Sequence, residues 1–252
     1  MNKVWLVNLG TVGYAEALEL QHRLVDARKR GELNDLLLLL EHTPVFTLGR
    51  NGRDEHILAS REYLDQVGIE VFRVERGGDV TYHGPRQLVG YPILDLHNFR
   101  MDVGWYVKSL EQVLIQTVNE FGLSGRRVGA DGEGRDSKLV GVWIDNPAPE
   151  PLVRQVQPDA KIAQIGARIE SWITYHGFAL NVDPIMQHFE LIVPCGISDK
   201  PVTSMALALG RPVGMEAVRE TVARNFKDVF KAGLEPLERE ELENRLDEAL
   251  QR

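Results

Sequence analysis

The sequence predicts a protein of the α+β or mixed α/β class, built on a mixed sheet flanked by helices. Segments with strand character cluster in the middle of the chain, and helical segments interrupt them at irregular intervals. The regular alternation of strand and helix that builds a doubly wound parallel sheet is missing. The 252 residues are enough to bury a substantial core, in one large domain or two small ones.

In the first part of the chain, short apolar segments predict strands and longer periodic segments predict helices. The run Leu36–Leu40 follows Asp35 and is short, which favours a buried strand, although leucine also favours helices. Ser60 can cap a helix that Gly68 ends. In chain order we expect a strand at 4–9, a helix at 12–30, strands at 36–40 and 45–48, a loop at 49–53, a helix at 60–67, and strands at 69–74, 80–82 and 88–96.

The clearest helix covers residues 103–121, where apolar residues share one face and Gly122 follows the last turn. The last helical segment carries Leu242, Leu246 and Leu250 on one stripe. In chain order we expect this helix, a glycine-rich loop at 129–136, a strand at 139–144, a proline-rich insertion at 146–160, strands at 162–169, 173–175 and 178–182, and helices at 214–230 and 237–250.

The composition limits the classes of function. A formal net charge of −8 argues against non-specific binding of nucleic acid, although a local basic patch could still meet an acidic partner. The single cysteine rules out an intramolecular disulfide and suits a reducing compartment. The N-terminal residues lack the apolar core of a signal peptide, and no apolar run is long enough to span a bilayer. We therefore expect a cytoplasmic protein that is not embedded in a membrane.

The single cysteine, Cys195, lies between Pro194 and Gly196. Proline fixes its own φ and glycine permits unusual backbone geometry, so a tight turn would present the thiol with little bulk around it. A lone cysteine is more often a small buried apolar residue than a nucleophile. The turn alone leaves both interpretations open.

A second candidate segment runs from Arg76 to Tyr91 and contains four glycines. Its free backbone N–H groups could hold a carbonyl or an anion, or its glycines could serve only the geometry of a β-turn. The spacing matches neither a phosphate-binding loop nor a dinucleotide fingerprint.

Lys161 and His176 are the remaining candidates. Near Cys195, the ammonium of Lys161 would favour the thiolate, and its neutral amine could take the thiol proton; a solvated strand end is the commoner fate of a lysine. His176 could be a base, a positioning group or a structural histidine. Seven histidines are present without an H-E-x-x-H pattern or a cysteine pair, so we expect no metal site.

Together these segments resemble the lipoyl(octanoyl) transferases, the octanoyltransferase family of lipoate biosynthesis. The similarity extends from about Val4 to Phe230, with its motifs in family order. It rests on Glu41–Arg50, Arg76–Gly78, His83–Pro85, Gln87–Pro92, Lys161–Ala163, Tyr175–Gly177, Leu180–Asn181 and Pro194–Ile197.

The resemblance implies a fold like that of the biotin and lipoate protein ligases. It implies one catalytic domain over residues 1–235, followed by a charged amphipathic helix at 236–252. The expected reaction moves an octanoyl group from acyl carrier protein to a lysine. The acceptors are the lipoyl domains of 2-oxoacid dehydrogenases and the glycine cleavage H protein. No cofactor is expected, because a thioester already carries the energy needed to form an amide.

The resemblance also assigns roles to residues. Cys195 is expected to form an acyl-thioester and Lys161 to activate it. The acyl site is expected to consist of Arg76, Gly77, Gly78, Asp79, Val80, Thr81, Tyr82, His83, Gln164, Ile165, Gly166, His176, Gly177 and Phe178. The alternatives are an ATP-dependent lipoate or biotin ligase, a thioesterase, and an acyl-binding module without turnover.

Two features remain to be explained. Arg86 stands where the family usually has glycine, so it could contact an acidic carrier or restrict φ. Because the carriers are typically acidic, we expect a local basic rim drawn from Arg50, Arg53, Arg73, Arg76, Arg86, Arg126 and Arg127.

Overall fold

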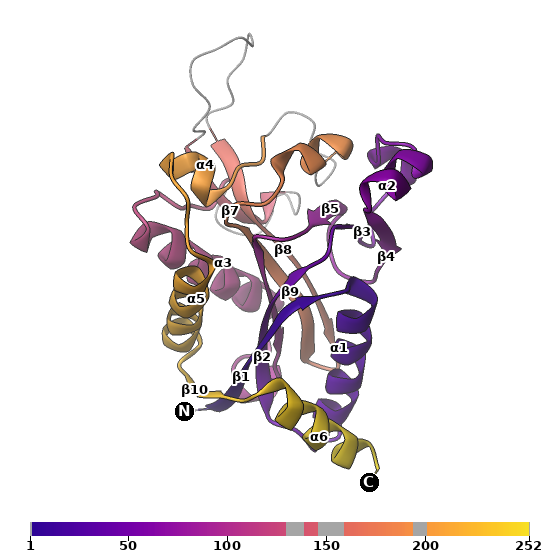
Figure 1. Cartoon of the computed structure of the whole chain (residues 1–252). Helices are drawn as coiled ribbons and strands as arrows, with labels where there is room; N and C mark the ends of the chain where they lie inside the picture. Colours follow the sequence, from indigo (N-terminus) through magenta and orange to yellow (C-terminus); the bar gives the residue numbers. More distant parts are fainter. Residues whose placement is uncertain (1, 130–138, 146–158, 194–200, 252) are drawn as a thin grey trace, which may run out of the picture.

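A computed structural model describes residues 2–129, 139–145, 159–193 and 201–251. They form a seven-stranded sheet in the order β10-β1-β2-β6-β9-β8-β7 and a three-stranded sheet in the order β4-β3-β5 (Figure 1). The large sheet is mixed, because β1 pairs in parallel with β2 and β10, whereas the pairs from β2 through β6, β9 and β8 to β7 are antiparallel. This confirms the predicted fold class.

The strands of the large sheet are β1 (Asn2–Val12), β2 (Asp35–His42), β6 (Gln87–Ile93), β7 (Gly141–Asp145), β8 (Asp159–Glu170), β9 (Ile173–Asn181) and β10 (Ala232–Pro236). Those of the small sheet are β3 (Val45–Leu48), β4 (Glu70–Arg73) and β5 (Val80–His83). The helices are α1 (Tyr14–Lys29), α2 (Arg61–Val67), α3 (Val103–Glu120), α4 (Met205–Leu209), α5 (Met215–Phe230) and α6 (Arg239–Leu250). Short 3-10 turns occupy Asp54–His56, Leu96–Asn98 and Met186–Leu191.

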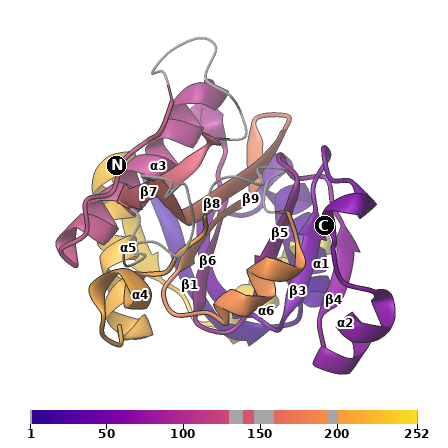
Figure 2. The same ribbon diagram turned by 90° about the horizontal axis from the view of Figure 1, so that it is seen from above.

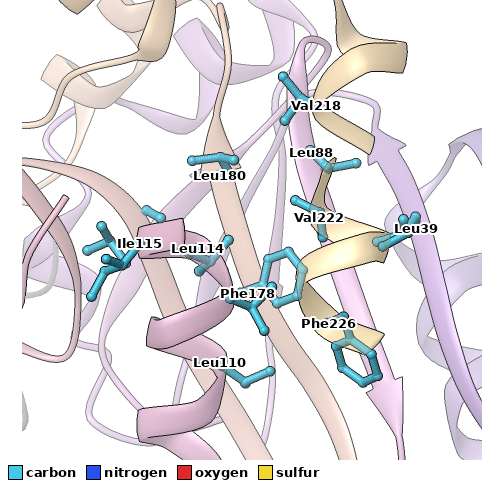
Figure 3. Close-up of a cluster of buried hydrophobic side chains, with 14 of the residues drawn as sticks. Leu39, Leu88, Leu110, Leu114, Ile115, Phe178, Leu180, Val218, Val222 and Phe226 are labelled. Atoms are coloured by element: carbon cyan, nitrogen blue, oxygen red, sulfur yellow. The ribbon is translucent and has the colours of Figure 1, made fainter. Parts of the chain in front are cut away.

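Helices cover both faces of the large sheet. On one face, side chains of α3 and α5 pack against the sheet in a cluster that includes Leu114, Phe178 and Phe226 (Figure 3). On the other face, α1 and α6 pack against the alternate residues of the same strands. The run Leu36–Leu40 is apolar throughout because its side chains alternate between these two buried faces.

The small sheet lies on the same side of the large sheet as α1 (Figure 2). Its own core includes Phe46, Tyr82 and Phe189. The short helix α2 begins as expected, with the Ser60 hydroxyl accepting a bond from the Tyr63 N–H, and it ends at Gly68 with φ 70°. This sheet brings the end of β5 across from β8 and β9 (Figure 2).

The prediction of separate strands at 173–175 and 178–182 is wrong, because β9 is one strand. It stays paired with β8 through His176 and Gly177. His176 has a φ of 52°, so a strand residue takes a left-handed conformation without ending the strand. The sequence did not predict α4 or β10. In α6, Leu250 is 41% exposed and Ala249 is buried in its place.

The helix α6 contributes to the core against α1. Leu242 and Leu246 are fully buried there. Two ion pairs join the helices, Arg239 with Glu16 at 2.5 Å and Arg23 with Asp247 at 2.6 Å. The division into residues 1–235 and 236–252 stays a prediction.

The expected loop at 129–136 and insertion at 146–160 lie mostly outside the described residues. Within the part of the chain that the structure describes, no helix is both long enough and apolar enough to cross a membrane.

Candidate active site

A pocket opens between the two sheets, where β5 and the loop before it face β8 and β9. Its lining contains every expected acyl-site residue except Gly77 and Tyr82. The lining is Tyr14, Arg76, Gly78, Asp79, Val80, Thr81, His83, Tyr91, Gln164, Ile165, Gly166, His176, Gly177, Phe178 and Ala179. The expected residues come from segments that are far apart in the chain, and the fold places them around one pocket. The expected acyl site did not include Tyr14, Tyr91 or Ala179, which also line it.

The two exceptions, Gly77 and Tyr82, lie behind the pocket lining and support the elements that form it. The Tyr82 ring packs edge-on against Phe46 and Phe189, inside the core of the small sheet. The Gly77 N–H donates to the carbonyl of Ala167 at 3.1 Å, which joins the glycine-rich loop to β8. That N–H is therefore engaged within the protein.

Arg76 holds the glycine-rich loop in place from the inside. Its side chain is buried, and Nη2 donates to Thr47 O at 2.6 Å and to Asp79 O at 2.8 Å. Nη1 donates to Gly77 O at 2.9 Å. A Cβ atom at Gly49 would lie 2.8 Å from Arg76 Nη1, so only glycine fits beside the guanidinium. Arg76 thus fixes the pocket wall by binding backbone carbonyls.

Three histidines near the pocket are held in the neutral state by burial. His42 donates through Nδ1 to Val12 O at 2.9 Å, and its Nε2 accepts from the Tyr91 hydroxyl at 2.7 Å. Burial lowers the pKa of His42 to about 4 and that of His176 to about 3. Burial also lowers the pKa of His83 well below its usual value. These rings can donate or accept hydrogen bonds, but they carry no charge at neutral pH.

Lys161 lies in β8, three residues before the first pocket-lining residue of that strand, Gln164. It is 4% exposed, and its Nζ lies 5.1 Å from the centroid of the Trp143 ring. On the neighbouring strand, the Gly141 N–H donates to Glu111 Oε1 at 3.1 Å. The other carboxylate oxygen of Glu111 accepts from Arg127 Nε at 2.7 Å.

Cys195 lies outside the described residues, but both flanks of its segment are described. Before it, the Val193 N–H donates to His56 O at 2.8 Å, and His56 Nδ1 pairs with Asp79 at 2.7 Å. After it, the Lys161 N–H donates to Pro201 O at 2.8 Å. The residue before segment 194–200 is therefore bonded to a histidine that pairs with the pocket-lining Asp79. The residue after the segment is bonded to the backbone of Lys161.

A model of the lipoyl protein ligase A/B catalytic domain matches residues 13–227. An octanoyltransferase from Koribacter versatilis is 49% identical over 230 residues, covering 90% of this chain and 84% of the relative. The chain belongs to the octanoyltransferase family. A second octanoyltransferase, from Solibacter usitatus, is 47% identical and covers 91% of this chain and 94% of the relative. The family predicted from the motifs is thus confirmed, and the protein is an acyltransferase.

Solved structures of lipoate ligases share the fold of this octanoyltransferase. A bipartite lipoate protein ligase from Thermoplasma acidophilum has a TM-score of 0.70 at 16% identity and covers 100% of this chain and 93% of the ligase. A lipoate-protein ligase A bound with ATP has a TM-score of 0.69 at 14% identity and covers 100% of this chain and 94% of that one. At this identity the likeness concerns the fold alone, and it confirms the expected ligase-like architecture.

The expected basic rim of the octanoyltransferase needs correction. Arg76 is buried, so it cannot belong to a rim. Other members of the set already pair with acidic side chains: Arg73 with Asp54, Arg86 with Asp183, Arg126 with Asp145 and Asp159, and Arg127 with Glu111. Arg50 and Arg53 are exposed at the loop after β3. The rim is therefore smaller than the sequence suggested.

Arg86 occupies the turn where the family usually has glycine, and its φ is 64°. Its backbone N–H donates to Glu41 Oε2 at 2.7 Å. Its guanidinium pairs with Asp183 at 2.9 Å and donates to Val213 O at 3.2 Å. The turn thus requires a left-handed residue, and the arginine side chain is used within the protein.

Proposed function

We propose that this octanoyltransferase moves an octanoyl group from acyl carrier protein to a lysine on a lipoyl domain or on the glycine cleavage H protein. Cys195 carries the acyl group as a thioester, and Lys161 activates Cys195. The observation that carries the proposal is the position of Lys161: it lies on the strand that lines the pocket, and its backbone pairs with Pro201, just after the cysteine segment.

The first half-reaction forms the acyl-enzyme. The ammonium of Lys161 favours the thiolate of Cys195, which attacks the thioester carbonyl of the donor. The tetrahedral intermediate expels the thiolate of the carrier, and Lys161 supplies the proton that this leaving group takes up. Lys161 is then neutral and Cys195 is acylated. The apolar part of the pocket buries the alkyl chain, which contributes about 0.8 kcal/mol per methylene.

The second half-reaction transfers the acyl group to the acceptor lysine. Its neutral amine attacks the thioester, and the new C–N bond forms as the bond to Cys195 sulfur breaks. The nitrogen passes a proton to neutral Lys161, which restores the pair of thiolate and ammonium. Conversion of a thioester to an amide is downhill, so the reaction needs no ATP. The single cysteine agrees with the reducing conditions of a cytoplasm, where we place the reaction.

Intact-mass measurement tests the nucleophile. The protein is incubated with octanoyl-acyl carrier protein without ATP, and it should gain the mass of one octanoyl group. The Cys195→Ala variant should gain none. A Cys195→Ala variant that still acquires the label would rule out the assigned nucleophile, and a strict need for ATP and free octanoate would indicate a ligase instead.

Alkylation with iodoacetamide tests the activator, because the chain has one cysteine and the label reports on that thiol alone. The Lys161→Ala variant should need a higher pH for the same alkylation rate. Lys161→Arg is the matched variant: it keeps the positive charge but cannot accept a proton. It should therefore retain much of the thiol reactivity and still lose acyl transfer. An unchanged alkylation profile in Lys161→Ala would contradict the role of Lys161.

Product analysis separates transfer from hydrolysis. With a lipoyl domain present, octanoyl should appear on the domain as an amide. Release of free octanoate at the same rate with and without the domain would instead identify a thioesterase.

A further inference from the structure

Two buried amide side chains, Gln87 and Asn181, connect the wall of the acyl pocket to the segment that pairs with Lys161. Both amides lie in the motifs that resemble the octanoyltransferases, and the reaction described above gives them no role. Each is completely buried. They face each other across the ladder between β6 and β9, where Gln87 pairs with Asn181. Polar groups at such a depth are stable only when their donors and acceptors are satisfied.

Lys161 lies at the point where β8 changes its partner. On this side of β8, the ladder with β9 ends at the pair of Ala163 and Leu180. Two residues beyond that pair, Lys161 forms an isolated parallel bridge with Val202. Residues 201–203 thus take the place of β9 beside Lys161. Because an isolated bridge lacks the support of a ladder, it opens more easily than a pair of long strands. The contact between Lys161 and this segment therefore depends on further bonds.

Asn181 supplies one of these bonds. Its Nδ2 donates to Thr203 O at 2.9 Å, while the Thr203 N–H donates to Lys161 O at 2.9 Å. Thr203 is thus bound to Lys161 through its N–H and to the last residue of β9 through its carbonyl. A second bond, from the Ala206 N–H to Val182 O at 2.9 Å, holds the start of α4 nearby. Asn181 is therefore the side chain that fastens residue 203 to the large sheet.

Two backbone carbonyls fix the orientation of both amides. A carbonyl only accepts, so Asn181 presents its NH₂ group to Thr203 O and its Oδ1 to Gln87. Gln87 Nε2 donates to Asn181 Oδ1 at 2.8 Å and to Tyr82 O at 3.0 Å. Gln87 Oε1 then accepts from Nδ1 of His83, which lines the pocket, at 2.7 Å. The hydrogen bonds are thus continuous from a pocket-lining ring to the segment beside the proposed activator.

We propose that Asn181, oriented by Gln87, is a positioning residue for acyl transfer. It keeps residues 201–203 on the backbone of Lys161, and so it fixes the proposed activator against the chain that follows the cysteine segment. Asn181 acts through Lys161 and not on the substrate. This inference rests on the proposed function, in which Lys161 activates Cys195.

The test begins with Asn181→Ala, which removes the donor to Thr203 O. Acyl-enzyme formation should slow about tenfold or more, because small displacements of a reacting group have large effects on rate. Alkylation of the single cysteine by iodoacetamide should also need a higher pH for the same rate, as in Lys161→Ala. Intact-mass detection gives the first rate, and alkylation over a series of pH values gives the second.

Thr174→Ala is the matched control at the opposite end of β9. Thr174 is completely buried, and its Oγ1 donates to Pro92 O at 2.7 Å and accepts from the Leu94 N–H at 3.0 Å. The substitution removes two buried hydrogen bonds, as Asn181→Ala does, and it should also lower the melting temperature. It should leave the alkylation profile and the acylation rate unchanged. The same changes in Thr174→Ala would show that lost stability alone explains them, which overturns the proposal.

The double variant separates an effect through Lys161 from an independent one. If Asn181 acts through Lys161, then adding Asn181→Ala to Lys161→Ala should shift the alkylation profile no further. Additive shifts would overturn the proposal, as would an unchanged profile and acylation rate in Asn181→Ala alone.

A second variant decides if thermal melts show that Asn181→Ala does not fold. Gln87→Leu removes the group that orients the Asn181 amide, so it should shift the alkylation profile in the same direction and add nothing in the Lys161→Ala background. An unchanged profile in Gln87→Leu would then overturn the proposal. An unchanged profile in Lys161→Ala itself is a different result: it would reject the activator in the proposed function, and the positioning role would be rejected with it.

Discussion

The side chain of Lys161 lies against the bare backbone of Gly141. A Cβ atom at Gly141 would be 2.6 Å from Lys161 Cε and 2.5 Å from the carbonyl oxygen of Ala163. Gly141 also has a φ of 135°, which side chains rarely permit. With Nζ 5.1 Å from the centroid of the Trp143 ring, the lysine is enclosed by the neighbouring strand β7. The glycine thus shapes the space that holds the proposed activator.

A Gly141→Ala substitution should displace Lys161 and slow formation of the acyl-enzyme by about 10- to 100-fold, because small displacements of a reacting group have large effects on rate. Single-turnover measurements with intact-mass detection give this rate directly. Gly214→Ala is the matched control, since Gly214 has a φ of −73° and nothing within 4 Å of the added Cβ. Wild-type acylation by Gly141→Ala would show that the space beside Lys161 is not required.

A Glu111→Gln substitution should destabilise the protein by about 2 kcal/mol, because it leaves the Arg127 guanidinium facing an uncharged amide. Glu111 is fully buried, and its carboxylate joins Arg127 to the backbone of Gly141. The measurement is urea unfolding at neutral pH. Arg224→Gln removes an exposed ion pair with Glu120 and should cost no more than about 1 kcal/mol. Equal losses in both variants would contradict a special role for the buried pair.

Periodicity predicted most of the fold because most elements have a buried face with a regular spacing. The elements that it missed lack such a face: α4 is a single short turn of Met205–Leu209, and β10 has the sequence Ala-Gly-Leu-Glu-Pro and forms by pairing with the edge of β1. The break expected at His176 failed for a different reason. A positive φ usually marks a turn, but here the strand continues because β8 and Gln21 hold the backbone on both sides.

The sequence predicted the site residues that lie close together in short motifs. It did not predict the residues that only tertiary packing brings to the pocket. The segments around Arg76 and Gln164 line the pocket as expected. Tyr14 reaches the pocket from the start of α1, and nothing in the helical pattern separates this role from an ordinary core position. Arg76 was expected in the acyl site and also among the candidates for the basic rim. The sequence does not show that backbone carbonyls bind its buried guanidinium, which excludes it from the rim.

The turn at Arg86 predicts a difference between two small substitutions. Arg86→Gly loses the exposed ion pair with Asp183 but relieves the left-handed φ of 64°, so its stability should stay within about 1 kcal/mol of the original. Arg86→Ala loses the same ion pair and keeps the strain. It should therefore be about 1 kcal/mol less stable than Arg86→Gly in urea unfolding. Equal stability of the two variants would show that the turn relaxes to a negative φ.

Stability should decrease as the pH falls from about 6.5 towards 4. Burial lowers the pKa of His42 from 6.5 to about 4 in the folded protein, so in this window the unfolded chain binds the proton more readily. Neutral His42 therefore makes its full contribution to the free energy of unfolding above pH 6.5. This contribution is lost as the pH falls towards 4, and the loss is no more than about 1.4 kcal/mol per pH unit. Urea unfolding across this range should show a shallower slope for His42→Gln. An unchanged slope in His42→Gln would contradict the assignment.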